Sequence, residues 1–232
     1  MERRTLLGAA AAAPLTGPAV AAASNRSAGR PLRVQVVMFD GAEEQDYTAP
    51  YEVFSLAGRL SGGAARVSYV TATGPRVVTA SWGTRVEVAN GWAPREADLL
   101  VVPGGGFGRP NEPGIWAEIN EGTLPRLLAA AAPRRGLTVS SLCTGAIVLA
   151  AAGLTSGRPC TTHTGAKAEL ARRGGVVKDA RVVDDRDLVT AAGVTSGLEL
   201  ALHLVRRELG ADVAIACENV LEYESRGIVW TS

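Results

Sequence analysis

The sequence predicts an α/β domain in which helices cover both faces of a mostly parallel sheet. Short continuous apolar runs, such as residues 34–39 and 99–102, are typical of strands buried in a parallel sheet. Helical stretches lie between such runs, so strands and helices alternate along the chain. The 232 residues are 47% hydrophobic and 20% charged, which is sufficient for one large domain with a filled core. The loops at the carboxyl ends of the strands are expected to hold the functional site.

Residues 1–23 are predicted to form a Tat-type signal peptide. It begins with a twin arginine and continues through a weakly apolar, alanine-rich segment to small residues suited to cleavage. A membrane anchor is less favoured because Pro14, Gly17 and Pro18 interrupt the segment, and an ordinary N-terminal tail is the alternative. We therefore expect an exported, periplasmic or extracellular protein that does not stay in the membrane. Residues 24–32 are expected to form a flexible lead-in, and residues 33–232 a single domain.

The elements of this domain are expected in a regular order. After the strand at 34–39, a helix is predicted at 50–57 and a strand at 67–71. Segments in which apolar and polar residues alternate lie on both sides of Ser81-Trp82-Gly83, and they predict a hairpin. The strand at 99–102 ends in a glycine-rich loop, and Pro133 ends the helix that follows. The remaining predicted elements are a strand from Leu137, a helix after Cys143, a strand at 161–163, short strands near Val182 and Leu188, and helices at 166–173, 196–209 and 211–221.

Cys143 carries more functional information than any other residue. It lies in the run Leu137-Thr-Val-Ser-Ser-Leu-Cys-Thr-Gly-Ala-Ile-Val-Leu, in which an apolar strand turns sharply into an apolar helix. Ser141 and Gly145 complete the small-x-nucleophile-x-small pattern of a nucleophile elbow. Backbone N–H groups and the positive end of the helix dipole favour the thiolate there, so we expect a lowered pKa of the thiol. The pattern predicts a catalytic or redox cysteine rather than an inert core residue.

Charge and composition exclude several functions. Removal of residues 1–23 takes away two arginines and one glutamate, so the mature chain has a formal net charge of zero. It also contains no block rich in lysine or arginine, and no nucleic-acid surface is expected. The three cysteines form no C-x-x-C pair, and the two histidines are not part of a His-x-Glu sequence, so no zinc site is expected. Cys143 is expected to be a free thiol, while the spacing leaves a disulfide between Cys160 and Cys217 open.

The glycine-rich loop Gly104-Gly105-Gly106-Phe107-Gly108 does not predict a dinucleotide site. Arg109 occupies the third required glycine position of the G-x-G-x-x-G pattern. Glycines instead permit backbone N–H groups to approach a small ligand closely, and a plain loop is the alternative. No cofactor is expected.

Four carboxylates follow the first predicted strand, at the sheet edge that is expected to carry Cys143. They are Asp40, Glu43, Glu44 and Asp46. Each is equally suited to a turn or to the N-cap of the next helix, and the residues alone do not choose among them.

The two histidines have different surroundings. His163 ends a predicted strand after Cys143 and could reach the thiol, with a packing or capping role as the alternative. His203 shares a predicted helix face with Glu199, Arg206 and Arg207, which predicts an exposed surface residue.

Several ordered motifs together resemble the ThiJ/PfpI superfamily over roughly residues 33–230. They are Phe39-Asp-Gly-Ala-Glu-Glu-Gln-Asp-Tyr-Thr-Ala-Pro-Tyr-Glu-Val-Phe, Asp98-Leu-Leu-Val-Val-Pro-Gly-Gly, Ser141-Leu-Cys-Thr-Gly-Ala, Thr161-Thr-His, Val194-Thr-Ser-Gly-Leu-Glu-Leu-Ala-Leu-His-Leu-Val and Leu221-Glu-Tyr-Glu. Within the superfamily the chain is most similar to the isonitrile hydratase branch and to the ligand-binding domains of AraC-type regulators. The chain ends at Ser232 and is expected to lack the helix-turn-helix domain of those regulators.

The resemblance implies a flavodoxin-like three-layer sandwich that forms a homodimer and acts on a small-molecule substrate. It implies that Cys143 is the nucleophile and Asp46 its acidic partner. Backbone N–H groups of Gly105 and Thr144 would polarise the substrate, and Gly104 and His163 complete the expected substrate-binding set. Two positions depart from the family pattern: Ala49 stands where glycine is usual, and Thr164 where tryptophan is common. Both changes are expected to reshape the pocket.

The activity that the resemblance implies is hydration of an isonitrile to an N-substituted formamide through a cysteine thioimidate. Asp46 would first supply a proton and then activate water, and the two groups are expected to share one proton, with the carboxyl pKa raised. One alternative is a glyoxalase or deglycase acting on small dicarbonyls. Another is a secreted, non-catalytic module that binds a small molecule or senses redox state. The missing His-x-Glu sequence argues against amidotransferase chemistry.

Overall fold

Seven strands form one central sheet in the computed structural model, which describes residues 29–232. Neighbouring strands are parallel throughout, except that β9 and β10 are antiparallel. The predicted signal peptide lies outside the described residues. The order across the sheet is β11 (Val229–Thr231), β9 (Val182–Asp185), β10 (Leu188–Ala191), β6 (Thr138–Ser141), β5 (Leu99–Val102), β1 (Leu32–Met38) and β2 (Ala65–Thr71).

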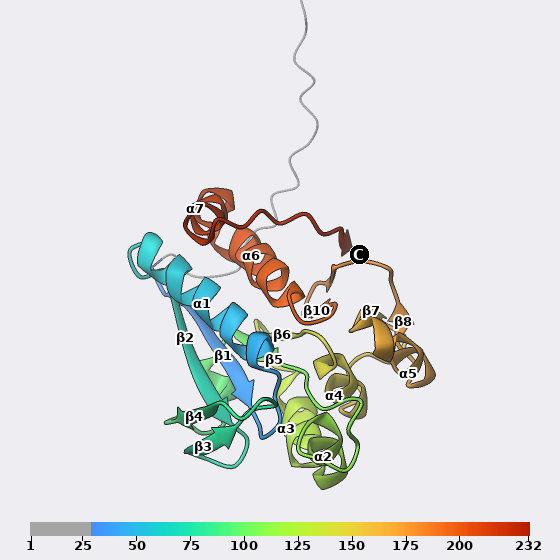
Figure 1. The fold of residues 1–232 in the computed structure, drawn as a ribbon. Helices are drawn as coiled ribbons and strands as arrows, with labels where there is room; N and C mark the ends of the chain where they lie inside the picture. Colours follow the sequence, from blue (N-terminus) through green and yellow to red (C-terminus); the bar gives the residue numbers. More distant parts are fainter. Residues whose placement is uncertain (1–28) are drawn as a thin grey trace, which may run out of the picture.

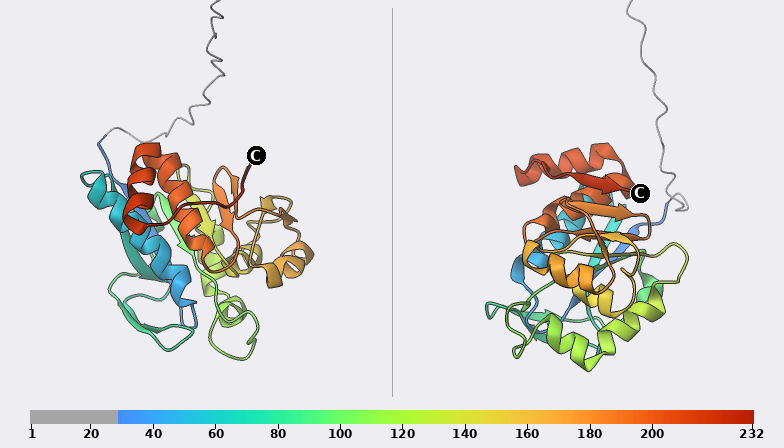
Figure 2. Two further views of the ribbon diagram at one scale, coloured as in Figure 1. Left: turned by 45° about the horizontal axis from the view of Figure 1, so that its top comes forward. Right: turned by 90° about the vertical axis from the view of Figure 1, so that its right-hand side faces the viewer.

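Helices cover both faces of this sheet (Figures 1 and 2). On one face α1 (Glu44–Leu60), α6 (Ser196–Leu209) and α7 (Ala211–Leu221) contact one another. On the other face α2 (Ile115–Glu121), α3 (Thr123–Ala131) and α4 (Gly145–Ala151) pack together, with α5 (Lys167–Arg172) beside α4. The predicted flavodoxin-like three-layer sandwich with a mostly parallel sheet is therefore confirmed.

The core explains why these runs fold as they do. Every residue of β5, β9 and β10 is buried, as expected for strands covered on both faces. The amphipathic helix α6 buries its apolar face, including Leu200 and Leu204, against the sheet and α1. Among residues 29–232, no helix is long and apolar enough to cross a membrane.

Some predicted boundaries shift. Helix α1 begins at Glu44, six residues before the predicted start, and contains Pro50 within its length. Helix α2 was not predicted. The predicted hairpin is present as β3 (Arg76–Thr79) and β4 (Arg85–Val88), and two single turns of 3-10 helix occur at Pro94–Glu96 and Thr164–Ala166.

The predicted strand at residues 161–163 is wrong. Only Pro159–Cys160 forms a short strand, β7, which pairs with β8 (Val176–Val177) outside the main sheet. The next residues bond to other groups: the Thr161 N–H donates to Thr190 Oγ1, and the Thr162 hydroxyl and the His163 N–H donate to the carbonyl of Cys143. These bonds tie the segment to the elbow and to a side chain of β10, and none of them pairs it with the backbone of a strand.

His203 is not an exposed surface residue, contrary to the sequence prediction. Its imidazole is 16% exposed and its Nε2 lies 2.7 Å from Asp184 Oδ2. Arg207 also contacts this carboxylate, with both oxygens at 3.1 Å from Nη1. The buried carboxylate of Asp184, on β9, needs charged or hydrogen-bonding partners, and α6 supplies them from the face that packs on the sheet.

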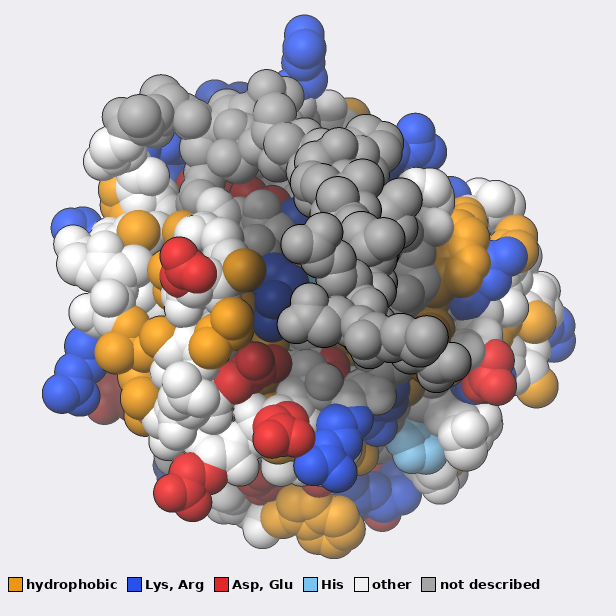
Figure 3. Space-filling view, turned by 90° about the horizontal axis from the view of Figure 1, so that it is seen from above, with side chains coloured by type: hydrophobic (Ala, Val, Ile, Leu, Met, Phe, Trp, Pro, Cys, Tyr) orange, Lys and Arg blue, Asp and Glu red, His pale blue; other side chains and the backbone are white. Residues whose placement is uncertain are grey.

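Charged side chains of both signs are visible on the surface of the molecule seen from above (Figure 3). On the side shown in Figure 3, acidic and basic side chains are interspersed rather than gathered by sign.

Candidate active site

Four loops meet at one edge of the sheet. They follow β1, β5, β6 and β10, which run parallel, so their carboxyl ends lie together. The loop after β6 carries Cys143, and the loop after β1 leads to Asp46 in the first turn of α1. The loop after β5 carries Gly104 and Gly105.

The backbone at Cys143 forms the predicted sharp turn. Its φ of 50° lies in the left-handed region, which is rare for residues other than glycine, and its side chain is buried, with 6% exposed. The Cys143 N–H donates to Ala192 O at 2.7 Å, and its carbonyl accepts the Thr162 hydroxyl at 2.6 Å. A Cβ on Gly145 would lie 2.3 Å from Val102 O, so only glycine fits at that position. The elbow is thus fixed from β5, β10 and the segment after β7.

Asp46 is fully buried and faces the thiol. Its Oδ2 accepts the Gly104 N–H at 2.8 Å, while its Oδ1 is buried without a hydrogen-bond partner of standard geometry. The Cys143 thiol faces this carboxyl, and each of the two groups shifts the pKa of the other. The carboxyl is therefore oriented by backbone on one side and directed at sulfur on the other.

The structure separates Asp46 from the three other carboxylates of the segment. Asp40 forms an ion pair with Arg76 at 2.7 Å. Glu44 accepts the backbone N–H of Trp82 at 2.9 Å, and Glu43 accepts the indole N–H of the same residue at 2.7 Å. These three carboxylates hold the β3–β4 hairpin in place. Of the four carboxylates, Asp46 is the one that faces the Cys143 thiol.

Burial raises the pKa of both groups. Burial, with a smaller contribution from the charge of Glu43, raises the pKa of Asp46 to about 7, although the bonds from Gly104 and Cys143 oppose the shift. Burial and the negative charge of Asp46 raise the pKa of Cys143 to about 12. The expectation of a lowered thiol pKa is therefore wrong, because burial and a facing carboxylate outweigh the backbone N–H groups at the elbow. The raised carboxyl pKa agrees with the expected sharing of a proton.

The backbone N–H donors are arranged differently from what the family resemblance implied. The Gly105 N–H donates to Thr144 Oγ1 at 3.0 Å, and the Gly104 N–H is bound to Asp46. The backbone N–H groups of Val194 and Thr144 interact with the sulfur of Cys143 and stabilise its charged form. Thr144 therefore keeps its expected place, while Gly105 reaches a substrate only if the Thr144 hydroxyl turns away.

Val194 was missed by sequence reasoning as a site residue. It follows β10 and has a φ of 27°, again in the left-handed region. This backbone turn directs its N–H toward the thiol. The only signal in the sequence was its place at the start of a motif that resembles the family, because its side chain carries no chemistry.

His163 does not act on the thiol in this structure. Its Nδ1 accepts the Gly165 N–H at 3.1 Å and so caps the following 3-10 turn, Thr164–Ala166. Its ring also packs against Gly193, where a Cβ would lie 2.3 Å from His163 Cδ2. Only the backbone of His163 bonds to Cys143. The capping alternative therefore describes its side chain.

The described part of the chain contains no candidate metal cluster and no disulfide. No group of three or more histidine, cysteine, aspartate or glutamate residues is arranged to hold a metal ion within residues 29–232. All three cysteines are free, so the Cys160–Cys217 disulfide that the spacing left open is absent.

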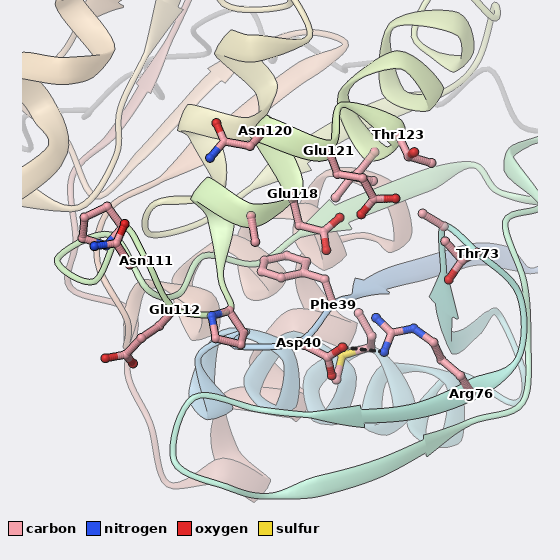
Figure 4. Close-up of a pocket in the computed structure, with 16 residues that line it drawn as sticks. Phe39, Asp40, Thr73, Arg76, Asn111, Glu112, Glu118, Asn120, Glu121 and Thr123 are labelled. Carbon is pink, nitrogen blue, oxygen red and sulfur yellow. Dashed lines mark hydrogen bonds and ion pairs between the residues drawn. The ribbon is translucent and has the colours of Figure 1, made fainter.

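A cavity of about 710 Å³ lies at the same edge of the sheet, and neither Cys143 nor Asp46 is among its lining residues (Figure 4). The carboxylates of Glu118 and Glu121 point into the space above the Asp40–Arg76 ion pair. Burial, reinforced by the charges of Glu121 and Asp40 and opposed by Arg76, raises the pKa of Glu118 to about 7. This cavity is thus a mixed-charge pocket separate from the elbow.

Glu118→Gln is expected to stabilise the protein only at neutral and alkaline pH. A carboxyl whose folded pKa is raised stabilises the fold fully below its ordinary pKa and loses that contribution as pH rises through the folded pKa. The gain in unfolding free energy should be about 2–3 kcal/mol at pH 8 and close to zero at pH 4. Urea denaturation at both pH values measures it, with the exposed Glu112→Gln as control. An equal gain at both pH values would contradict the burial explanation.

Comparisons with known proteins agree with this architecture. The isonitrile hydratase of Pseudomonas putida is 31% identical over 194 residues, which are 83% of this chain and 78% of that protein. A solved ThiJ/PfpI family protein from Pseudomonas syringae has a TM-score of 0.73 at 25% identity, covering 91% of this chain and 84% of the other. A solved AraC family transcriptional regulator from Pseudomonas putida has a TM-score of 0.70 at 28% identity, covering 82% of this chain and 100% of that structure.

The family itself is established by a direct match. The model of the DJ-1/PfpI family matches residues 32–207, which include the elbow, the glycine-rich loop and Asp46. The resemblance to the ThiJ/PfpI superfamily is confirmed, and the chain belongs to the DJ-1/PfpI family.

Proposed function

We propose that this protein is a cysteine-dependent isonitrile hydratase, which converts R–N≡C and water to the formamide R–NH–CHO. The observation that carries the proposal is the buried pair in which the Asp46 carboxyl, with a pKa of about 7, faces the Cys143 thiol. An acid with a pKa near the working pH both gives and takes protons efficiently. The similarity to an isonitrile hydratase supports the choice of substrate.

The first half of the reaction adds the thiol across the terminal carbon of the isonitrile. Because the pKa of Cys143 is raised to about 12, the thiolate is scarce at neutral pH and must form as the substrate reacts. Ionised Asp46 takes the thiol proton, the sulfur bonds to the terminal carbon, and Asp46 returns that proton to the same carbon. The product of this half is the thioimidate R–N=CH–S–Cys143, and the carboxylate is ready again.

The second half hydrolyses the thioimidate. Asp46 removes a proton from a water molecule, whose oxygen bonds to the thioimidate carbon, and passes that proton to the nitrogen. The C–S bond then breaks, the formamide leaves, and the proton from the hydroxyl returns through Asp46 to sulfur. The N–H groups of Thr144 and Val194 support the departing thiolate. The proposed reaction uses no cofactor.

The site supports catalysis over redox sensing. Oxidation of a cysteine to sulfenic acid proceeds through the thiolate, and sensor cysteines are exposed and have low pKa values. Cys143 has a raised pKa and is 6% exposed. A neutral thiol beside a base is typical of an enzyme in which the thiolate forms only when substrate is present.

The substrate assignment is tested by comparing two electrophiles. The purified protein is mixed at pH 7 with cyclohexyl isocyanide, and N-cyclohexylformamide is measured by liquid chromatography with mass detection. A parallel reaction with methylglyoxal is assayed for lactate. We expect formamide at a rate well above the buffer reaction and no lactate. Lactate without formamide would reject the hydratase in favour of the dicarbonyl enzyme, and neither product would favour a binding module.

A further inference from the structure

A second cavity, of about 310 Å³, adjoins the elbow. It lies between the segment that follows β7 and the loop that follows β10. Four of its lining residues bond to Cys143: the Thr162 hydroxyl and the His163 N–H donate to the Cys143 carbonyl, Ala192 O accepts the Cys143 N–H, and the Val194 N–H interacts with the sulfur. The cavity therefore borders the residues that hold the elbow, and Val194, whose N–H interacts with the sulfur, lines it, although Cys143 itself does not.

The charged side chains that line this cavity are cationic. Lys167 and Arg181 are part of the lining, together with the imidazole of His163, and no carboxylate is among its lining residues. The hydroxyls of Thr164 and Thr195 add neutral hydrogen-bonding groups. Such a lining suits an anion that accepts hydrogen bonds.

Arg181 is held in a fixed orientation. Its Nε and Nη2 donate to the carboxylate of Glu199 at 3.2 and 2.9 Å, and Nη2 also donates to Thr195 Oγ1 at 2.9 Å. Glu199 is buried and does not line the cavity. The guanidinium is thus preorganised, and an incoming anion does not have to order it.

Lys167 is available to change partners. Its ammonium lies 2.7 Å from Asp179, whose side chain is fully exposed. Exposed ion pairs contribute little to stability, so the ammonium can turn to an anion in the cavity at small cost. Asp179 is not among the cavity's lining residues either.

We propose that this cavity is an anion subsite that binds a carboxylate carried by the substrate of Cys143. The inference rests on the proposed function and narrows it to isonitriles that bear a carboxylate group. The nearest chemical alternative is a free carboxylate that occupies the cavity independently of the substrate.

The kinetic test compares isocyanoacetate with methyl isocyanoacetate, which carries an uncharged ester in place of the carboxylate. A charge-assisted bond to Lys167 should favour the anion in kcat/KM by about tenfold in the wild type. Lys167→Met should remove this preference. Lys178→Met is the matched control, because the Lys178 ammonium lies over the Trp230 ring, 4.9 Å from its centroid, and outside the cavity. Intrinsic reactivity differences between the substrates cancel when variants are compared.

A second variant fills the cavity without removing charge. Thr164 is exposed at the cavity wall, so Thr164→Trp should fold normally and block the space. It should abolish the preference for isocyanoacetate, measured as the ratio of kcat/KM for the anion to kcat/KM for the methyl ester. An unchanged anion preference in both Lys167→Met and Thr164→Trp would overturn the proposal.

A binding measurement separates this inference from the proposed function. Acetate is titrated into the wild type, Lys167→Met and Lys178→Met, and its inhibition of isocyanoacetate turnover is measured. We expect weak binding that Lys167→Met removes, and inhibition that is competitive. Lysine-dependent binding without competition would overturn the substrate subsite in favour of an independent anion site. If no isonitrile is turned over, the proposed hydratase fails, and Lys167-dependent binding of acetate would then still support an anion site. Absence of both turnover and acetate binding would overturn the hydratase and the anion site together.

Discussion

Asp46→Asn is expected to lower kcat for formamide formation by about 10³-fold or more, because one carboxyl serves both halves of the reaction. Asparagine cannot take the thiol proton, return it to the isonitrile carbon or deprotonate water. Its side-chain oxygen can still accept the Gly104 N–H, so the loop geometry should persist. Steady-state rates by formamide detection measure the loss, with Asp40→Asn as the control for removing a carboxylate from the same segment. Activity within tenfold of the wild type would reject Asp46 as the acid and base.

The same substitution should stabilise the fold above neutral pH. Asp46 has a folded pKa raised to about 7, so its contribution to stability is present below its ordinary pKa and lost as pH rises through 7. Asparagine carries no charge at any pH, and the variant should gain on the order of 2–3 kcal/mol at pH 8 relative to wild type and little at pH 4. Higher stability together with lost turnover would identify a group kept for catalysis rather than for folding. Equal stability at pH 8 would contradict the burial effect.

Cys143→Ala is expected to have the largest effect and to reduce formamide formation by about 10⁴-fold or more, down to the buffer rate. Without sulfur no thioimidate forms, and water must attack the isonitrile directly. Alanine also carries a Cβ, so it meets the left-handed backbone of the elbow with no more strain than cysteine. Circular dichroism and thermal unfolding should therefore resemble the wild type.

Two other buried cysteines provide matched controls for this variant. Cys160 and Cys217 are free and fully buried, and neither is placed in the site. Cys160→Ala and Cys217→Ala each leave a small cavity and should lower stability by about 1 kcal/mol, with turnover retained. A comparable loss of turnover in either control would show that the effect of Cys143→Ala comes from the fold rather than from the nucleophile.

Features set by short stretches of sequence could be predicted. The run from Leu137 to Leu149 contains both the buried strand and the small residues that permit the elbow, and the structure contains both. Likewise, continuous apolar runs predicted parallel strands, because a strand that is buried on both faces needs apolar residues at every position. The family resemblance also pointed to Asp46, although the residues alone left four carboxylates equivalent.

Features that depend on distant contacts could not be predicted. The pKa of the thiol is raised because the thiol is buried and because Asp46, on α1, faces it, and local helix-dipole reasoning contains neither effect. His203 is partly buried because Asp184, its partner, lies on a strand nineteen residues earlier. Val194 contributes only a backbone N–H, whose direction depends on a turn that the side chain does not encode. In each case the decisive group comes from elsewhere in the chain.

The covalent intermediate provides the most direct test of the central claim. The protein is mixed with cyclohexyl isocyanide, quenched in acid within milliseconds to seconds, and analysed by intact-mass and peptide mass spectrometry. We predict a transient mass increase of one isonitrile per chain, located on the peptide that contains Cys143 and absent from Cys143→Ala. Formamide production with no such adduct at any time, and at an unchanged rate in Cys143→Ala, would contradict the account.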